Sequence, residues 1–296
     1  MSQVALLAWI WLGCAVFVLG CAFRAFRYLR APDHLRWDLY PVAHDPRRDH
    51  GGSHLEEKDW WTKPRKTNPL GEVLVMGEEI LLLLGVFKNN RRLWWGSLPF
   101  HWGLYLMVAT TLGLLAAVLG VPGAWWRELL SLPAAAGGGL LALGSLVLLW
   151  MRAGDPRLRP YTTPLDLMNL ALLAGLGVLS LAVALTPGGM DLASLAVGDL
   201  LRGRPLQVPA LLAAQMATAA LFLGYLPATR MIHFFSKYFT YHLVRWDDRP
   251  RVPGSALDRR LAAALNFGVS WAAPHIQTGH TWVEVASNLP AGDKGK

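Results

Sequence analysis

Charged residues and cysteines are both scarce in this sequence. Only 16% of its 296 residues are charged, whereas 53% are hydrophobic and the mean hydropathy is +0.31. So little charge cannot cover a globular surface, which argues against a soluble domain and favours a membrane protein. The two cysteines, Cys14 and Cys21, lie in one apolar stretch. They are too few for a disulfide framework and match no metal or redox motif, so we interpret them as small packing residues.

Several motifs of enzymes and transporters are also absent. The sequence has no glycine-rich nucleotide-binding pattern, no P-loop and no nucleophile elbow. It has no internal repeat of the kind found in secondary transporters. The run AAAGGG at residues 134–139 falls in an apolar stretch, where small residues favour close helix packing. These absences argue against enzymes that depend on such motifs and against a repeat-based transporter.

Long hydrophobic runs, in contrast, are abundant. A hydrocarbon core of about 30 Å is crossed by about 20 helical residues. Five runs are long enough, and they cover residues 4–23, 98–119, 133–151, 165–185 and 210–235. Each should be a helix, because lipid offers no other partner to backbone N–H and C=O groups. The predicted fold class is therefore all-α integral membrane, with five transmembrane helices.

Tryptophans lie near the ends of several of these runs. They are Trp94, Trp95, Trp102, Trp125, Trp126 and Trp150. Indole rings concentrate at the boundary between lipid and water, so this placement predicts an aromatic belt and supports the membrane interpretation.

Residues 69–87 form a further apolar stretch that is too short to span a membrane. Pro69 suits a first helical position, but the continuous apolar run covers only residues 80–87. Three glutamates in the stretch argue against burial in hydrocarbon. We predict an amphipathic helix over residues 69–87 that lies in the interface or dips in and out of it.

Basic residues cluster on one side of the predicted membrane. They follow the first, third and fifth spans and are Arg24, Arg27, Arg30, Arg36, Arg152, Arg157, Arg159, Lys237, Arg245, Arg249 and Arg251. The opposite loops carry Arg127, Arg202 and Arg204. By the positive-inside rule the N-terminus lies outside and the C-terminus in the cytoplasm, in the cytoplasmic (inner) membrane. The net charge of +8 is explained by topology and acidic headgroups, with no need for nucleic acid.

The first span could instead be a cleavable signal peptide. It has no basic residues before its apolar run, and no small-residue cleavage pattern precedes Arg24. We therefore interpret the first span as an anchor that remains in the mature chain.

Two histidines lie near the cytoplasmic ends of predicted spans. His101 is one turn inside the span 98–119 and His233 is near the end of the span 210–235, so both lie within about 10 Å of the surface by helical rise. Ionisable groups in membrane helices are costly, which favours a functional role. Because the two spans are antiparallel, the histidines could ligate one haem iron from both faces. A hydrogen-bonded interfacial position is the alternative, and the residues alone leave the choice open.

Small residues near these histidines fit either interpretation. Gly103, Gly113 and Gly224 would let a macrocycle approach the helix backbones. Small residues are equally common where membrane helices pack together.

Two stretches, PFHWGLYL at residues 99–106 and MIHFFSKYF at residues 231–239, resemble the membrane cytochrome b, or gamma, subunit of respiratory nitrate reductase. The chain is most similar to the branch found in transmembrane redox complexes of sulfate reducers, including the sulfite-reduction-linked Dsr complex. The likeness covers most of the chain, and SWAAPHIQTGHTWVEVA at residues 270–286 is its third motif. It implies a cytochrome domain over residues 1–242 and a cytoplasmic iron–sulfur partner that resembles the catalytic subunit of heterodisulfide reductase. Further membrane or periplasmic cytochrome subunits are also implied as partners.

The resemblance implies haem b with His101 and His233 as its axial ligands, and menaquinone as substrate. Nitrate reductase gamma subunits hold two haems, and the second pair of ligands falls at positions that are Thr111 and Gln215 here. Neither residue type normally ligates haem iron. We therefore expect one haem b per chain, the inner one nearest the cytoplasm, and no outer haem.

Loss of the outer haem means that the family's quinone site cannot simply be transferred. Four side chains near the remaining haem could donate hydrogen bonds to a quinone carbonyl, namely Arg92, Tyr105, Arg230 and Lys237. Each could also be a snorkelling or interfacial anchor, and Tyr105 could pack beside His101, one turn away on the same face.

Two segments outside the membrane are long enough to have a role. Residues 24–96 form a cytoplasmic loop that contains the predicted interfacial helix, and residues 243–296 form a cytoplasmic tail with a short amphipathic helix at about 257–266. The loop histidines, His34, His44, His50 and His54, match no standard zinc spacing, which favours partner docking over a metal site. The aromatic-rich tail is typical of an interface with a soluble partner.

The sequence thus predicts an electron-transfer subunit without a catalytic centre of its own, apart from a quinone site. It would pass electrons between menaquinone and the iron–sulfur subunit through one haem. A haem-free membrane anchor for the same soluble subunit shares every topological feature, so only the two histidines separate these alternatives.

Overall fold

The computed structural model describes residues 2–31, 69–120, 124–240, 253–273, 276 and 278–287. In these ranges the chain forms helices and no strand, apart from two isolated bridges in the tail. The helices are α1 (Gln3–Arg30), α2 (Pro69–Leu82), α3 (Leu84–Asn89), α4 (Arg91–Val118), α5 (Ala124–Gly154), η4 (Arg159–Tyr161), α6 (Pro164–Leu185), α7 (Gly189–Leu201), α8 (Ala210–Tyr225), η5 (Leu226–Ala228), η6 (Arg230–Ile232), α9 (His233–Thr240), α10 (Ala256–Leu265) and α11 (Trp282–Ser287). The all-α fold class is therefore confirmed.

Five helices of the described part of the chain are long and apolar enough to cross a membrane. They are Gln3–Arg30, Arg91–Val118, Trp125–Gly154, Pro164–Leu185 and Ala210–Ala228. The protein is thus a multi-pass membrane protein with the predicted number of spans. Helices α4 and α5 start well before the predicted residues 98 and 133, at Arg91 and Ala124. Pro99 and Pro133 therefore lie inside these helices. A membrane helix tolerates an internal proline where its surroundings satisfy the freed backbone groups.

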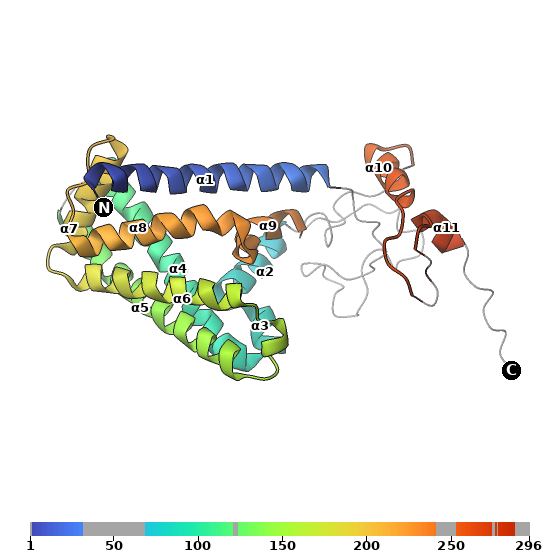
Figure 1. Ribbon diagram of the computed structural model, residues 1–296, viewed down its shortest axis with the longest axis horizontal. Coiled ribbons are helices and arrows are strands. Elements are labelled where there is room, and N and C mark those ends of the chain that lie inside the picture. Colours follow the sequence, from blue (N-terminus) through green and yellow to red (C-terminus); the bar gives the residue numbers. More distant parts are fainter. Residues whose placement is uncertain are drawn as a thin grey trace. The chain divides into compact units, whose positions relative to one another are not determined.

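The chain forms two compact units. The first contains residues Met1–Cys21 and Met76–Met231, and the second contains Ala22–Val75 and Ile232–Lys296. In the first unit α5 packs against α4 and α6, and α6 packs against α8. Helix α1 runs beside α8 (Figure 1), and the indole N–H of Trp9 donates to the carbonyl of Ala217 at 3.0 Å.

Glycines allow the central helices to touch through their backbones. A Cβ atom at Gly103 of α4 would collide with the backbone of Leu141 in α5, and one at Gly138 of α5 would lie 2.6 Å from the Leu181 nitrogen of α6. Close approach of this kind replaces the hydrophobic effect, which does not drive helices together inside lipid. The prediction that the run at residues 134–139 serves helix packing is confirmed at Gly137 and Gly138, whereas nothing lies within 4 Å of a Cβ at Gly139.

The fifth span is not one continuous helix to residue 235, so that prediction was wrong. Helix α8 ends at Tyr225 and two 3-10 turns follow before α9 begins at His233. Pro227 has no N–H with which to continue the helix. The buried hydroxyl of Thr229 donates to the carbonyl of Leu226 and accepts a bond from the N–H of Met231, so the break has its own polar partners.

The predicted helix over residues 69–87 begins at Pro69 as expected, but it is interrupted. Leu83 has a left-handed backbone with φ of 50° and separates α2 from α3. This conformation costs a non-glycine residue roughly 1–2 kcal/mol, and the elbow has compensating contacts. The Glu79 carboxylate accepts the N–H of Gly85 at 2.8 Å, at the start of α3.

Three further helices, α7, α10 and α11, lie in the described chain. Helix α7, which hydropathy did not identify, packs against α4, α5 and α6 on the first unit through Met190, Ala193 and Ala196. In the second unit the predicted amphipathic helix of the tail is confirmed as α10, whose cap is Ser255. Its buried residues Leu261 and Ala264 belong to a small folded tail that also contains α11.

Candidate functional site

His101 lies in α4 with its side chain half-buried. Its Nδ1 atom is 2.7 Å from the carbonyl oxygen of Ser97, one turn earlier in the same helix. A neutral imidazole that donates from Nδ1 carries its lone pair on Nε2, and such a bond is the usual way in which proteins fix the tautomer of a metal-ligating histidine. The side chain therefore has the chemistry of an axial ligand, although an interfacial histidine makes the same bond.

The neighbours of His101 define its place on the helix. Phe100 belongs to the buried cluster that α4 shares with α5 and α6. His101 follows about 100° round the helix, and its ring centre is 6.3 Å from that of Tyr105, whose hydroxyl contacts α2. His101 thus lies on the side of α4 between the face that packs on α5 and α6 and the face that contacts α2.

His233 is the first residue of α9 and its side chain is exposed. It follows the break at Pro227, whereas the sequence placed it inside a continuous span. His233 belongs to the second compact unit and His101 to the first. The pairing of these two histidines around one iron stays a prediction.

The three glycines that could either make room for a macrocycle or serve helix packing contact other helices. Gly103 meets the backbone of Leu141, Gly113 meets the side chain of Leu130, and Gly224 meets the backbone of Gly13. Their packing role, the second of the two interpretations, is the one that the structure supports. A haem at His101 would have to be accommodated elsewhere on the flank of α4.

Thr111 and Gln215, which occupy the positions of the second ligand pair in the resembled family, have local partners. The Thr111 hydroxyl donates to the carbonyl of Met107 at 2.9 Å within α4. The Gln215 amide donates to the Ser180 hydroxyl at 3.0 Å, which joins α8 to α6. At these two positions the side chains serve helix structure and helix pairing.

Two of the four predicted quinone donors have partners in the first unit. Arg92 forms an ion pair with Asp155 at 3.1 Å, which connects the start of α4 to the end of α5. The Tyr105 hydroxyl donates to the carbonyl of Ile80 at 2.9 Å. Tyr105 has a single O–H and would have to leave Ile80 before it could donate to a quinone, whereas the Arg92 guanidinium has further N–H groups beside the one paired with Asp155.

The other two quinone candidates lie at and beyond the break in the fifth span. Arg230 begins η6, after the break at Pro227. Lys237 is a residue of α9 in the second unit. Arg92, Tyr105 and Arg230 belong to the first unit and Lys237 to the second, so a quinone site shared by the four stays a prediction.

An aromatic clamp on α2 is the main feature of this region that the sequence did not reveal. Trp94, Trp102 and Tyr105 of α4 donate to the carbonyls of Leu82, Leu81 and Ile80 at 2.7, 3.0 and 2.9 Å. These carbonyls lie in the last turn of α2, where no intrahelical donor remains. Hydropathy and position predict an interfacial belt from such aromatic residues, and they carry no signal of these hydrogen bonds.

Three buried polar atoms have no hydrogen-bond partner among the described residues. They are the hydroxyl oxygens of Ser145 and Tyr225 and the amide oxygen of Asn169. The bond between Gln215 and Ser180 fixes the register of α8 against α6. Asn169 lies about three turns before Ser180, and Tyr225 lies about three turns after Gln215. Because the two helices are antiparallel, Asn169 and Tyr225 lie at a similar level. Buried polar atoms usually find partners, so this level of the bundle has unused hydrogen-bonding capacity.

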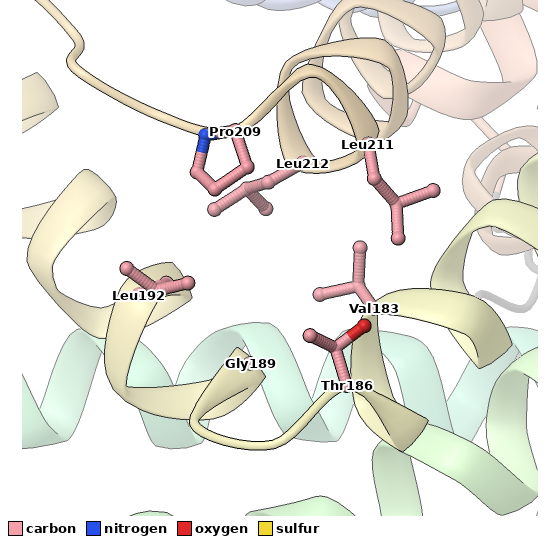
Figure 2. Close-up of a pocket in the computed structure, with 7 residues that line it drawn as sticks. All are labelled: Val183, Thr186, Gly189, Leu192, Pro209, Leu211 and Leu212. Carbon is pink, nitrogen blue, oxygen red and sulfur yellow. The ribbon is translucent and has the colours of Figure 1, made fainter.

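A small cavity of about 60 Å³ lies where α6, α7 and α8 meet. Figure 2 shows Val183, Leu192 and Leu212 around it, with Thr186, Gly189, Pro209 and Leu211. Ligand pockets typically measure about 300–1,000 Å³. The cavity is therefore far too small for a haem or a quinone, and its lining residues Val183 and Leu212 belong to a different core cluster from Phe100.

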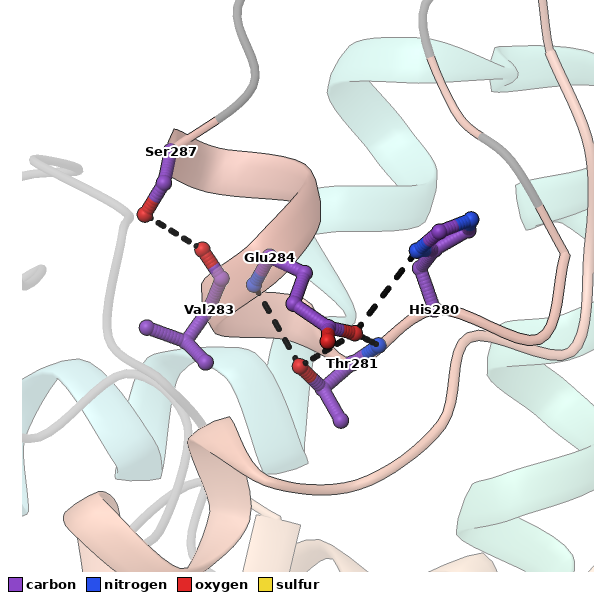
Figure 3. Close-up of polar contacts among 5 residues, drawn as sticks. All are labelled: His280, Thr281, Val283, Glu284 and Ser287. Carbon is purple, nitrogen blue, oxygen red and sulfur yellow. Dashed lines mark hydrogen bonds and ion pairs between the residues drawn. The ribbon is translucent and has the colours of Figure 1, made fainter.

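The tail contains a polar cluster at the start of α11 (Figure 3). The Glu284 carboxylate accepts the N–H of Thr281 at 2.7 Å and its hydroxyl at 3.0 Å, and it lies 3.7 Å from Nδ1 of His280. The hydrogen bonds to the backbone and hydroxyl of Thr281, with a smaller effect of the His280 charge, hold the pKa of Glu284 below its ordinary value of 4.5. This arrangement is a helix capping box.

Direct metal binding by a cluster of side chains finds no support in the described ranges, where no three His, Cys, Asp or Glu residues gather. Haem iron needs only two axial ligands from protein, so this finding does not bear on haem. The loop histidines His34, His44, His50 and His54 lie outside the described residues. Comparisons with protein-family models, curated proteins and solved structures return no match.

Proposed function

We propose that this chain is the membrane cytochrome b subunit of a respiratory redox complex in the cytoplasmic membrane. It would transfer electrons between menaquinone and a cytoplasmic iron–sulfur subunit of the heterodisulfide reductase type. One haem b, held by His101 and His233, would supply the one-electron carrier, since the protein itself has no redox group suited to that task.

The observation that supports this proposal most directly is the hydrogen bond between His101 Nδ1 and the carbonyl of Ser97. It orients the ring on a membrane helix and selects the tautomer whose Nε2 can bind iron. The surrounding side chains, Phe100 and Tyr105, limit the movement of the ring. Tyr105 could serve a quinone only by exchanging its bond to Ile80 for one to the quinone carbonyl.

A haem-free membrane anchor for the same soluble subunit is the second candidate. The glycine contacts favour it, because Gly103, Gly113 and Gly224 meet neighbouring helices. In this case His101 and His233 are interfacial residues whose loss leaves the membrane domain and its partner binding intact.

The test is a dithionite-reduced minus oxidised absorption spectrum of the purified full chain, with haem quantified per polypeptide. The variants are His101→Ala and His233→Ala, and His280→Ala in the tail is the matched control. About one b-type haem per chain is expected in the wild type and in the control. Each of the two ligand variants should lose it while still inserting into the membrane at wild-type levels.

The alternatives give different results in the same experiment. Wild-type protein without haem, even after expression with excess haem, would exclude the cytochrome function. The haem-free anchor would then be the remaining candidate. Haem that survives both ligand substitutions would show that other residues hold the iron.

A further inference from the structure

The last two turns of α1 carry an exposed surface of phenylalanine and arginine, which we call the Phe–Arg face. It consists of Phe23, Phe26, Arg27 and Arg30, all in the second unit. Phe23 is 61% exposed and Phe26 is 51% exposed, and both arginines are accessible at the surface. The Arg27 guanidinium carbon lies 6.0 Å from the centre of the Phe23 ring, and that of Arg30 lies 4.1 Å from the centre of the Phe26 ring.

Helix geometry turns this face away from α9. Residues three and four apart share one side of a helix, so the two stacked pairs lie next to each other. Tyr28 points to the opposite side, where its ring centre is 5.3 Å from that of Phe239 in α9. The side of α1 that contacts α9 is thus the side opposite the Phe–Arg face.

The charge on this face meets no acidic partner in the part of the chain that the structure describes. Helix α1 contains no Asp or Glu, and among the described residues no carboxylate forms an ion pair with Arg27 or Arg30. A guanidinium over an aromatic ring stays available to an anion, because the ring contacts its plane and leaves the N–H groups at the edge. Two such forks side by side suit a phosphate group.

The phenylalanines restrict where that phosphate can come from. Their exposed rings continue the apolar span of α1, which runs from Gln3 to Arg30 with high hydropathy. Aromatic rings next to basic residues are typical of the boundary between hydrocarbon and headgroups. A phosphate that is attached to acyl chains would contact both the arginines and the phenylalanine rings, whereas free phosphate would contact the arginines alone.

We infer that the Phe–Arg face binds an anionic phospholipid, with the headgroup phosphate on Arg27 and Arg30 and the acyl chains along Phe23 and Phe26. The inference concerns lipid binding by α1 and does not depend on whether the chain binds haem.

The experiment is native mass spectrometry of the purified full chain in neutral detergent, titrated with phosphatidylglycerol or with phosphatidylcholine. The wild type should bind phosphatidylglycerol much more tightly. The double variant R27Q/R30Q should weaken that binding by about 30-fold, which is about fivefold for each arginine. The matched control R157Q/R159Q removes two arginines from the connection between α5 and α6 and should leave binding unchanged.

A second variant and a competitor complete the test. F23L/F26L keeps the apolar surface but removes the rings and should weaken binding by a few-fold. Equal affinity for the two lipids, or equal losses in R27Q/R30Q and R157Q/R159Q, would overturn the inference. Full competition by 10-fold excess inorganic phosphate over lipid would overturn it too, because the site would then recognise phosphate alone. Haem content measured on the same samples reports separately on the proposed function.

Discussion

His101 illustrates how a single side chain in this protein depends on the backbone one turn before it. The Ser97 carbonyl holds Nδ1 at 2.7 Å, so the ring is oriented even without a metal. A ligand and an interfacial residue share this geometry, and they differ only in what Nε2 does. The haem spectra of His101→Ala and His233→Ala therefore decide between them.

Gly103 is the residue whose substitution tests the contact between α4 and α5. A Cβ at this position collides with the Leu141 backbone, so Gly103→Ala should force the helices apart and cost about 1–3 kcal/mol of stability. Gly139→Ala is the control, because nothing lies within 4 Å of a Cβ there and alanine favours helix by about 0.5–1 kcal/mol. Thermal unfolding in detergent should give a lower Tm for Gly103→Ala and an equal or higher one for Gly139→Ala. Equal Tm values in the two variants would contradict the close contact.

Protonation of Glu284 should destabilise the first turn of α11. Because the folded-state pKa is below the ordinary value of 4.5, the carboxylate stabilises the start of α11 above that pH. This contribution is lost as pH falls through the lower folded-state pKa. Amide exchange of residues 281–287 in the full chain, corrected for intrinsic pH effects, should accelerate in acid. In Glu284→Gln the extra acid sensitivity should disappear, and its persistence there would mean that another group is responsible.

Among the elements, the elbow between α2 and α3 combines an unfavourable backbone with an unusual set of partners. Leu83 is left-handed and buried, and the last carbonyls of α2 rely on the aromatic clamp of α4. The elbow thus keeps its shape through side chains that belong to another helix. Loss of a clamp donor should loosen α2 without disturbing α4.

The clamp can be tested with Tyr105→Phe and Trp102→Phe. Each removes one hydrogen bond to α2 and should reduce its stability by about 1 kcal/mol. Hydrogen exchange should become faster in residues 76–89, while Tyr161→Phe, which changes an exposed tyrosine of η4, should leave it unaltered. Unchanged exchange in both clamp variants would show that α2 is held by other contacts. If Tyr105 has only this structural role, haem content is unaffected in Tyr105→Phe.

At the scale of the whole molecule, the distribution of basic residues predicts which ends of the spans face the cytoplasm. Alkaline phosphatase inserted after Gly120, between α4 and α5, should be active because the positive-inside rule predicts that connection outside. The same enzyme inserted after Asp155 should be inactive, because Arg152, Arg157 and Arg159 retain that loop inside. A fluorescent protein at the C-terminus should fold and fluoresce in the cytoplasm. The reverse pattern would show that the topology is the opposite of the predicted one and that His101 lies near the outer surface.

The sequence by itself determined the helical class and the five spans, because lipid leaves backbone groups no partner except their own helix and hydropathy therefore reports the spans directly. It also located the start of α2 at Pro69 and the helix α10. The break after Tyr225 had a local signal in Pro227, but internal prolines at Pro99 and Pro133 did not end their helices. Whether a helix continues past a proline is thus decided by the neighbouring atoms and not by residue type.

Only the tertiary structure decided what the candidate site residues contact. Gly103 faces Leu141, Tyr105 bonds to Ile80, and Gln215 bonds to Ser180. Each of these partners lies on another helix, and helical periodicity predicts a face but not the atom that meets it. By sequence alone, Gly103 was compatible with a macrocycle or with a neighbouring helix, and Tyr105 with a quinone or with packing beside His101, because small and polar side chains can serve each of these roles.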